Sequence, residues 1–296
     1  NIRCLETLFL LTGRSTAVKS KPLPAGPAAR RPTGGFPMPP DPLINGHPAD
    51  VRLVTGSNRG IGLALVEAQL GRPGVSEVIA THRPAADLEK LMHLKAEHGD
   101  RLSLHTLDVT SETSLEAFRD FLAQRASGIN LAINATGILH EGEITPEKSL
   151  DQCNPDHLMR MFEVNSIGPL MVAGALLPTQ KRNHRFTFAA LSAMVGSIGD
   201  NRLGGWYGYR ASKTALNQFV RTLANECRLK HPRAAIVAVH PGTTDTDLSR
   251  PFQKNVHPDK LYSPRLTAER LLDVLESIDE SCSGQFLNWN GSTIPW

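Results

Sequence analysis

The sequence predicts one α/β domain, a doubly wound parallel sheet with helices on both faces. Short apolar runs alternate along the chain with helical patterns of about ten or more residues, which is typical of βαβ units. The first apolar run leads directly into a glycine-rich turn and then into a helix. No internal repeat interrupts this order, so we place a single domain at residues 49–296.

Each apolar run has a length typical of a buried strand. The runs are VRLVTG (51–56), EVIATH (77–82), LSLHTLDV (102–109), LAINATG (131–137), FTFAALSA (186–193) and AAIVAVHPG (234–242). Helical periodicity is found between and after them, in GIGLALVEAQL (60–70), residues 86–97, LEAFRDFLAQ (115–124) and LTAERLLDVLESI (266–278). Strands that alternate with helices in this way pair in parallel.

Residues 1–48 are not expected to fold with this domain. Eight prolines lie between Pro22 and Pro42, and such a stretch buries too little apolar surface to offset its ordering entropy. The segment is also basic and nearly free of acids, which is typical of an organelle transit peptide. We predict a disordered or targeting extension, with the protein in the cytoplasm, or in a plastid or mitochondrion if the extension is a transit peptide.

Charge and cysteine content argue against several classes of protein. The formal net charge of +3 is too small to indicate nucleic-acid binding. The four cysteines, Cys4, Cys153, Cys227 and Cys282, have neither metal-ligand nor disulfide-framework spacing, so we expect no metal and a reducing compartment. No apolar run approaches the roughly 18 residues that a membrane span needs, so no membrane partner is expected.

The turn TGSNRGIG (55–62) joins the first strand to the first helix. Glycines there let the backbone approach a pyrophosphate closely, and the helix N-terminus supplies N–H groups and a positive dipole end. A tight turn alone could have the same composition, but the strand–helix context makes the glycine pattern informative. We assign to a dinucleotide cofactor Thr55, Gly56, Ser57, Asn58, Arg59, Gly60, Ile61 and Gly62.

The end of the second strand indicates which dinucleotide is bound. Domains that prefer NAD place an acid about twenty residues after the glycine turn, where it holds the ribose 2′-hydroxyl. Here the segment ATHRP (80–84) has no acid and contains Arg83. Together with Arg59, it provides two guanidinium groups suited to a 2′-phosphate, so NADP(H) is favoured over NAD(H).

The segment YGYRASK (207–213) contains a candidate proton donor. Tyr209 and Lys213 are four residues apart, so on a helix their side chains lie on the same face. A neighbouring cation lowers the pKa of a phenol, which would bring Tyr209 toward the working pH. Tyr207 is not an alternative donor, because the residue four positions on is Ala211. The glycine turn upstream favours catalysis over an ordinary polar helix face.

These motifs, in this order, resemble the short-chain dehydrogenase/reductase family over 49–296, which implies a Rossmann-type fold. The resemblance implies catalytic roles for Tyr209 and Lys213, with Asn165 of FEVNSIGP holding a water that links Lys213 to solvent. It also implies a homodimer or homotetramer. Further cofactor contacts implied by the family motifs are Asp108, Val109, Asn134, Ala135, Gly137, Pro241, Gly242, Thr243 and Thr246.

A narrower resemblance concerns the C-factor and sniffer-like carbonyl reductases. It rests on GSIGDN (196–201), GGWYGYRASKTALN (204–217), HPGTTDTDLSRPF (240–252) and the terminal NWNGSTIPW. The likeness implies an NADPH-dependent oxidoreductase that reduces a small ketone or aldehyde to an alcohol. Two alternatives remain open, a C-factor-type signalling or regulatory protein with vestigial catalysis and an NAD-dependent alcohol dehydrogenase. The arginines Arg59 and Arg83 count against the second.

One departure from the family pattern concerns its catalytic serine. The family spelling is SxxG, whereas SAMVG places three residues between Ser192 and Gly196. Strict spacing would put Ala193 at the serine position, and Ser197 is another candidate. We predict that Ser192 hydrogen-bonds the carbonyl oxygen of the substrate, because a shift of one residue at the strand end would bring it there.

Overall fold

The computed structural model describes residues 43–44 and 47–296. The predicted extension at 1–48 therefore lies largely outside the described residues, and its nature stays a prediction. At the start of the described part, β1 (Leu43–Ile44) pairs antiparallel with β2 (His47–Pro48). The described residues belong to one compact unit.

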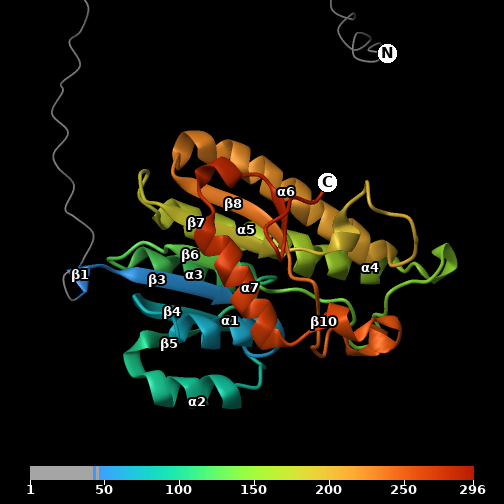
Figure 1. Cartoon of the computed structure of the whole chain (residues 1–296), viewed down its shortest axis with the longest axis horizontal. Coiled ribbons are helices and arrows are strands. Elements are labelled where there is room, and N and C mark those ends of the chain that lie inside the picture. The colour runs from blue at the N-terminus through green and yellow to red at the C-terminus, as the bar shows by residue number, and fades with distance from the viewer. Residues whose placement is uncertain (1–42, 45–46) are drawn as a thin grey trace, which may run out of the picture. The chain divides into compact units, whose positions relative to one another are not determined.

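Seven parallel strands form the central sheet in the order β11–β8–β7–β6–β3–β4–β5 (Figure 1). The order along the chain reverses between β3 and β6, so the crevice beyond their carboxyl ends is the place where such sheets bind ligands. The doubly wound α/β fold is confirmed. The strands are β3 (Asp50–Thr55), β4 (Val75–His82), β5 (Leu102–Thr106), β6 (Leu131–Asn134), β7 (Phe186–Leu191), β8 (Ala234–His240) and β11 (Phe286–Asn288).

Helices cover both faces of the sheet (Figure 1). One face carries α1 (Gly60–Leu70), α2 (Glu89–His98) and α7 (Pro264–Ser277), and the other carries α3 (Glu112–Ala123), α5 (Gly168–Leu176) and α6 (Tyr207–Lys230). Because both faces are covered, successive strand residues are buried on opposite sides. Leu53 and Val54 are both fully buried, which explains why the strands read as continuous apolar runs.

The sequence analysis missed the helical stretch before β7. There α4 (Pro155–Phe162) continues through a π-helical turn, Glu163–Ile167, into α5. Among the described residues, Pro155–Thr179 is long and apolar enough by composition to cross a membrane, a segment the sequence analysis did not find. Of its most apolar 18-residue window 61% is buried inside the protein, as expected for a core helix. The short pair β9 (Thr243–Thr244) and β10 (Leu261–Tyr262) was also not predicted.

Candidate active site

A cavity of about 200 Å³ lies at the carboxyl ends of the central strands. The segments that follow β3, β4, β5, β6, β7 and β8 all contribute to its lining, together with the start of α6. The fold therefore brings to one place motifs that are far apart in the sequence. The predicted site residues that line the cavity are Gly56, Asn58, Arg59, Gly60, Ile61, Gly62, Arg83, Asp108, Val109, Ala135, Gly137, Ser192, Tyr209, Lys213, Pro241 and Thr246.

The glycine turn has the backbone that a phosphate site requires. Gly56 adopts φ +73°, a conformation that L side chains rarely take. A Cβ on Gly62 would lie 2.1 Å from the carbonyl oxygen of Gly56, so only glycine allows the helix to approach the strand this closely. The N-terminus of α1 has neither a side-chain cap nor an acid in its first turn. Its N–H groups and positive dipole end therefore suit the pyrophosphate of a dinucleotide.

Several predicted residues lie behind the cavity wall and do not line it. Thr55 Oγ1 donates to Asn134 Oδ1 at 2.5 Å, and Ser57 Oγ donates to the carbonyl of Val54 at 2.8 Å. A Cβ on Gly242 would lie 2.9 Å from the Tyr262 ring and 3.1 Å from the Trp289 ring, and Thr243 begins β9. These side chains and turns hold the shape of the strand ends. Their contact with a cofactor, like that of Asn134, remains a prediction.

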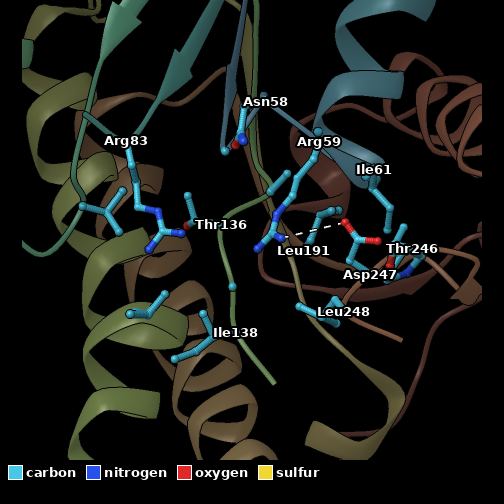
Figure 2. A pocket seen from close by; sticks show the side chains of 18 of the residues that line it. Asn58, Arg59, Ile61, Arg83, Thr136, Ile138, Leu191, Thr246, Asp247 and Leu248 are labelled. Atoms are coloured by element: carbon cyan, nitrogen blue, oxygen red, sulfur yellow. Dashed lines mark ion pairs between the residues drawn. The ribbon is translucent and has the colours of Figure 1, made fainter. Parts of the chain in front are cut away.

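Two arginines extend into the cavity on either side of Thr136 in the view of Figure 2. Arg83 follows β4, and its Nη1 pairs with Glu141 Oε1 at 3.1 Å. Arg59 is the last residue before α1, and its Nη1 lies 3.9 Å from Asp247 Oδ2. More than half of each arginine side chain is exposed, so both guanidinium groups are free to exchange partners with an anionic ligand.

Asp108 lies on the lining after β5, close to the same positive charges. Burial alone would raise the pKa of Asp108. Two hydrogen bonds from Thr110 and the charges of Arg160 and Arg83 outweigh burial and lower the pKa below its usual value. Asp108 is therefore an ionised acceptor, suited to hydrogen-bond donors such as those on an adenine ring.

Tyr209 and Lys213 are buried on the first turns of α6, with 8% and 4% of their surface exposed. Lys213 Nζ donates to the carbonyl of Leu191 at 2.9 Å and lies 5.8 Å from the centre of the Tyr209 ring. The two side chains share one helix face, as their spacing predicts.

Trp206, just before the helix, has φ 54° and provides no side-chain cap. The buried Glu147 takes that role, because its Oε2 accepts the N–H of Gly208 at 3.1 Å.

The predicted direction of the Tyr209 pKa is wrong. Burial raises the pKa of Tyr209 to about 12 and lowers that of Lys213 to about 8. Desolvation disfavours the charged form of each group, and it outweighs the effect of the lysine charge that the spacing predicted. Tyr209 is consequently a protonated phenol at neutral pH, a state suited to donating a proton.

Asn165 lies in the π-helical turn and is fully buried. Its Oδ1 accepts the N–H of Ile138 at 2.7 Å, and its Nδ2 donates to the carbonyl of Ile138 at 2.9 Å and to Ser212 Oγ at 3.0 Å. The side chain thus connects the segment after β6 to α6. A Cβ on Gly137 would lie 3.4 Å from both Asn165 Oδ1 and Lys213 Nζ, so Asn165 and Lys213 meet at this glycine.

Ser192 lines the cavity, but its hydroxyl is directed to α6. Ser192 Oγ donates to Asn217 Oδ1 at 2.7 Å, and its role toward a substrate carbonyl stays a prediction. The next residue, Ala193, packs in the apolar cluster that contains Tyr209. Ser197 is buried, and its hydroxyl accepts the N–H of Asp200. Ala193, the alternative that strict spacing gave, therefore packs near Tyr209, but of the two residues only Ser192 lines the cavity.

Four residues that contribute to this region were not predicted from the sequence. Arg160 and Asp247 line the cavity, Glu141 pairs with Arg83, and Phe252 packs on Trp206 with 5.1 Å between ring centres. Trp206 in turn contacts Tyr209 edge to face at 6.1 Å. No local signal could identify Glu141 or Arg160, because their roles depend on contacts between distant segments. Among residues 43–44 and 47–296, no group of three His, Cys, Asp or Glu side chains could hold a metal ion.

The sheet order, the glycine turn and the ligand cavity together define a dinucleotide-binding protein with a Rossmann-type fold. Residues 50–257 match the family model of short chain dehydrogenases, and the chain belongs to this family of oxidoreductases.

Curated relatives include a 1-hydroxy-2-glutathionyl-2-methyl-3-butene dehydrogenase of Rhodococcus sp. (strain AD45). It is 28% identical over 82% of this chain and 98% of its own length. The C-signal protein of Myxococcus xanthus is 32% identical over 47% of this chain and 78% of its own. The predicted likeness to the C-factor branch is confirmed by this match.

Solved structures of carbonyl reductases share the fold. The NADPH-bound carbonyl reductase from chicken fatty liver is 29% identical, with a TM-score of 0.73 over 84% of this chain and 94% of its own. The carbonyl reductase Sniffer of D. melanogaster has a TM-score of 0.72 over 84% of this chain and 100% of its own, at 24% identity. The first structure agrees with the predicted likeness to carbonyl reductases, and the second shows the shared fold.

Proposed function

We propose that this protein is an NADPH-dependent reductase that converts a ketone or aldehyde to an alcohol. The observation that carries the proposal is the protonated, buried Tyr209 beside Lys213 in a cavity that also contains a phosphate-type glycine turn and two arginines. The carbonyl reductase of chicken fatty liver, which binds NADPH, supports the same assignment.

The glycine turn would hold the pyrophosphate, and Arg59 and Arg83 the 2′-phosphate of the ribose. When bound, NADPH would supply the hydride for the carbonyl carbon and would become NADP+. As negative charge develops on the carbonyl oxygen, Tyr209 donates its phenolic proton to that oxygen, and the products are an alcohol and a tyrosinate. Lys213 stabilises the tyrosinate until a proton returns from solvent, a path in which Asn165 is the proposed water-holding residue.

At neutral pH Tyr209 is a protonated phenol, because burial raises its pKa to about 12. This is the form that carbonyl reduction requires of its proton donor. The cavity wall beside Tyr209 includes the apolar side chains of Ile138 and Leu248, and Trp206 and Phe252 pack in the same apolar cluster. A substrate with an apolar group next to its carbonyl fits this wall better than a charged one.

A panel of aldehydes and ketones with NADPH tests the proposal. We expect oxidation of NADPH by at least one carbonyl, and a loss of about 10²- to 10⁴-fold in kcat for Tyr209→Phe, the range typical of a general acid. Tyr207→Phe is the matched control, because Tyr207 does not line the cavity, and it should keep wild-type activity. Unchanged turnover in Tyr209→Phe would contradict the role of Tyr209.

The second candidate is a nucleotide-binding signalling protein with vestigial catalysis. The C-signal relative and the commitment of the Ser192 hydroxyl to Asn217 favour it. This candidate predicts NADPH binding without turnover of any carbonyl by the wild type. The same panel therefore separates the two functions.

A further inference from the structure

A chain of ion pairs crosses one end of the cavity. Arg83 Nη1 pairs with Glu141 Oε1 at 3.1 Å, and Glu141 Oε2 accepts from Arg160 Nε at 3.0 Å. Arg160 Nη1 also pairs with Glu163 Oε2 at 2.8 Å. The chain links the segment after β4, the segment after β6, α4 and the π-helical turn. Both arginines of this chain, Arg83 and Arg160, line the cavity.

Glu141 holds the guanidinium group that the proposed function assigns to the 2′-phosphate. Its backbone is fixed, since its N–H and carbonyl both bond with Ile144, at 3.1 and 2.9 Å. Only a third of its side chain is exposed, compared with 57% for Arg83. The acid is therefore the stationary partner and Arg83 the one that can swing to a ligand.

Because Glu141 also binds Arg160, Arg83 can leave Glu141 at a small cost in free energy. Each carboxylate oxygen of Glu141 contacts a different arginine, so Glu141 keeps a charge-assisted hydrogen bond to Arg160 when Arg83 leaves. Breaking an ion pair is usually costly because it leaves an unpaired buried charge. Here the departure of Arg83 leaves no such charge. Besides Glu141 and Glu163, Asp108 is an acid that feels the charges of both arginines, and it is held by Thr110.

We propose that Glu141 is a specificity-determining residue that competes with the cofactor's 2′-phosphate for Arg83. The inference rests on the proposed use of NADPH. A dianionic 2′-phosphate can replace the Glu141 carboxylate as the partner of Arg83. The neutral 2′-hydroxyl of NADH offers no comparable replacement. Glu141 thereby weakens NADPH binding by the strength of one ion pair and leaves NADH binding nearly unchanged.

The test is a fluorescence titration of the full chain and its Glu141→Gln variant with NADPH and with NADH. Glutamine keeps the size and hydrogen-bonding oxygen of the side chain and removes its charge. We expect NADPH to bind roughly two- to fivefold more tightly to Glu141→Gln, the range for a partly exposed ion pair, and NADH to change by less. Glu163→Gln is the matched control, because Glu163 pairs with Arg160 and leaves the Arg83–Glu141 pair intact.

A second background shows whether Glu141 acts through Arg83. In Arg83→Ala protein the additional Glu141→Gln change should have no effect on NADPH affinity, whereas a general structural role would persist. An unchanged NADPH affinity in Glu141→Gln, an equal gain for NADH, or a gain that survives in Arg83→Ala would each overturn the inference. A different result would overturn the proposed function, namely a wild type that binds neither dinucleotide or that prefers NADH.

Discussion

The two ends of the cavity differ in burial and in how their charged groups are partnered. Tyr209 and Lys213 at one end are almost fully buried, and burial alone shifts their pKa values. At the other end Arg59 and Arg83 are more than half exposed and each faces an acid on a neighbouring loop. The buried end is fixed before substrate arrives, whereas the exposed end changes partners when a ligand binds. Salt should therefore affect the second end strongly and the first end little.

Of the variants at the buried end, Lys213→Met is expected to lower turnover the most. Removing the cation should abolish most turnover, because the charge of Lys213, 5.8 Å from the centre of the Tyr209 ring, would stabilise the tyrosinate. The same lysine costs stability, since its pKa is about 8 in the folded protein and 10.5 in the unfolded chain. Between these values the unfolded chain binds more protons, so the unfolding free energy of the wild type rises with pH.

Urea unfolding at pH 8 and at pH 10.5 measures this contribution, the two values being those of the folded and unfolded lysine. The wild type should gain on the order of 3 kcal/mol relative to Lys213→Met over this interval. Above pH 10.0, the ordinary pKa of tyrosine, the raised pKa of Tyr209 lowers the unfolding free energy of both proteins. This contribution cancels when the two proteins are compared. If the difference in unfolding free energy between the two proteins were the same at both pH values, burial would not lower the pKa of Lys213.

At the exposed end, replacement of both Arg59 and Arg83 by alanine should weaken NADPH binding by about 10- to 100-fold, the value of one or two charge-assisted hydrogen bonds. NADH binding should change little. The salt dependence of NADPH affinity should also fall in the double variant, which a titration at low and high salt would detect. An equal loss for both dinucleotides would place the arginines on the pyrophosphate instead of the 2′-phosphate.

The smallest changes in kcat are expected for variants of Ser192 and Ala193. Ala193→Ser should add a hydroxyl on the Tyr209 side and raise kcat by about two- to tenfold, the worth of one hydrogen bond to the developing oxyanion. Ser192→Ala should change kcat less and lower stability instead, because it leaves Asn217 Oδ1 buried without its donor. Steady-state kinetics and thermal unfolding of both variants separate the roles. A large loss of kcat in Ser192→Ala would restore Ser192 as the catalytic serine.

The strands and the glycine turn could be predicted because their causes are local. β3 and β4 follow from apolar runs, and the turn at Gly56 and Gly62 follows from a backbone that only glycine can adopt. The four-residue spacing of Tyr209 and Lys213 also placed both side chains on one face of α6. In each case the information lies within a few consecutive residues.

The rest depends on contacts between distant segments. The pairing of Glu141 with Arg83 and Arg160 requires three segments to meet, and the direction of the Ser192 hydroxyl depends on Asn217. The pKa of Tyr209 was predicted in the wrong direction, because spacing reveals the neighbouring charge but not the extent of burial. Sequence therefore identified the groups in the site more reliably than their protonation and partners.

The central claim is that this cavity binds NADPH in preference to NADH for carbonyl reduction. A titration of the full chain with each dinucleotide, followed by nicotinamide fluorescence, tests it most directly. We expect NADPH to bind at least about tenfold more tightly, the contribution of one charge-assisted hydrogen bond to the 2′-phosphate. Equal affinity, preference for NADH, or no binding of either would contradict it.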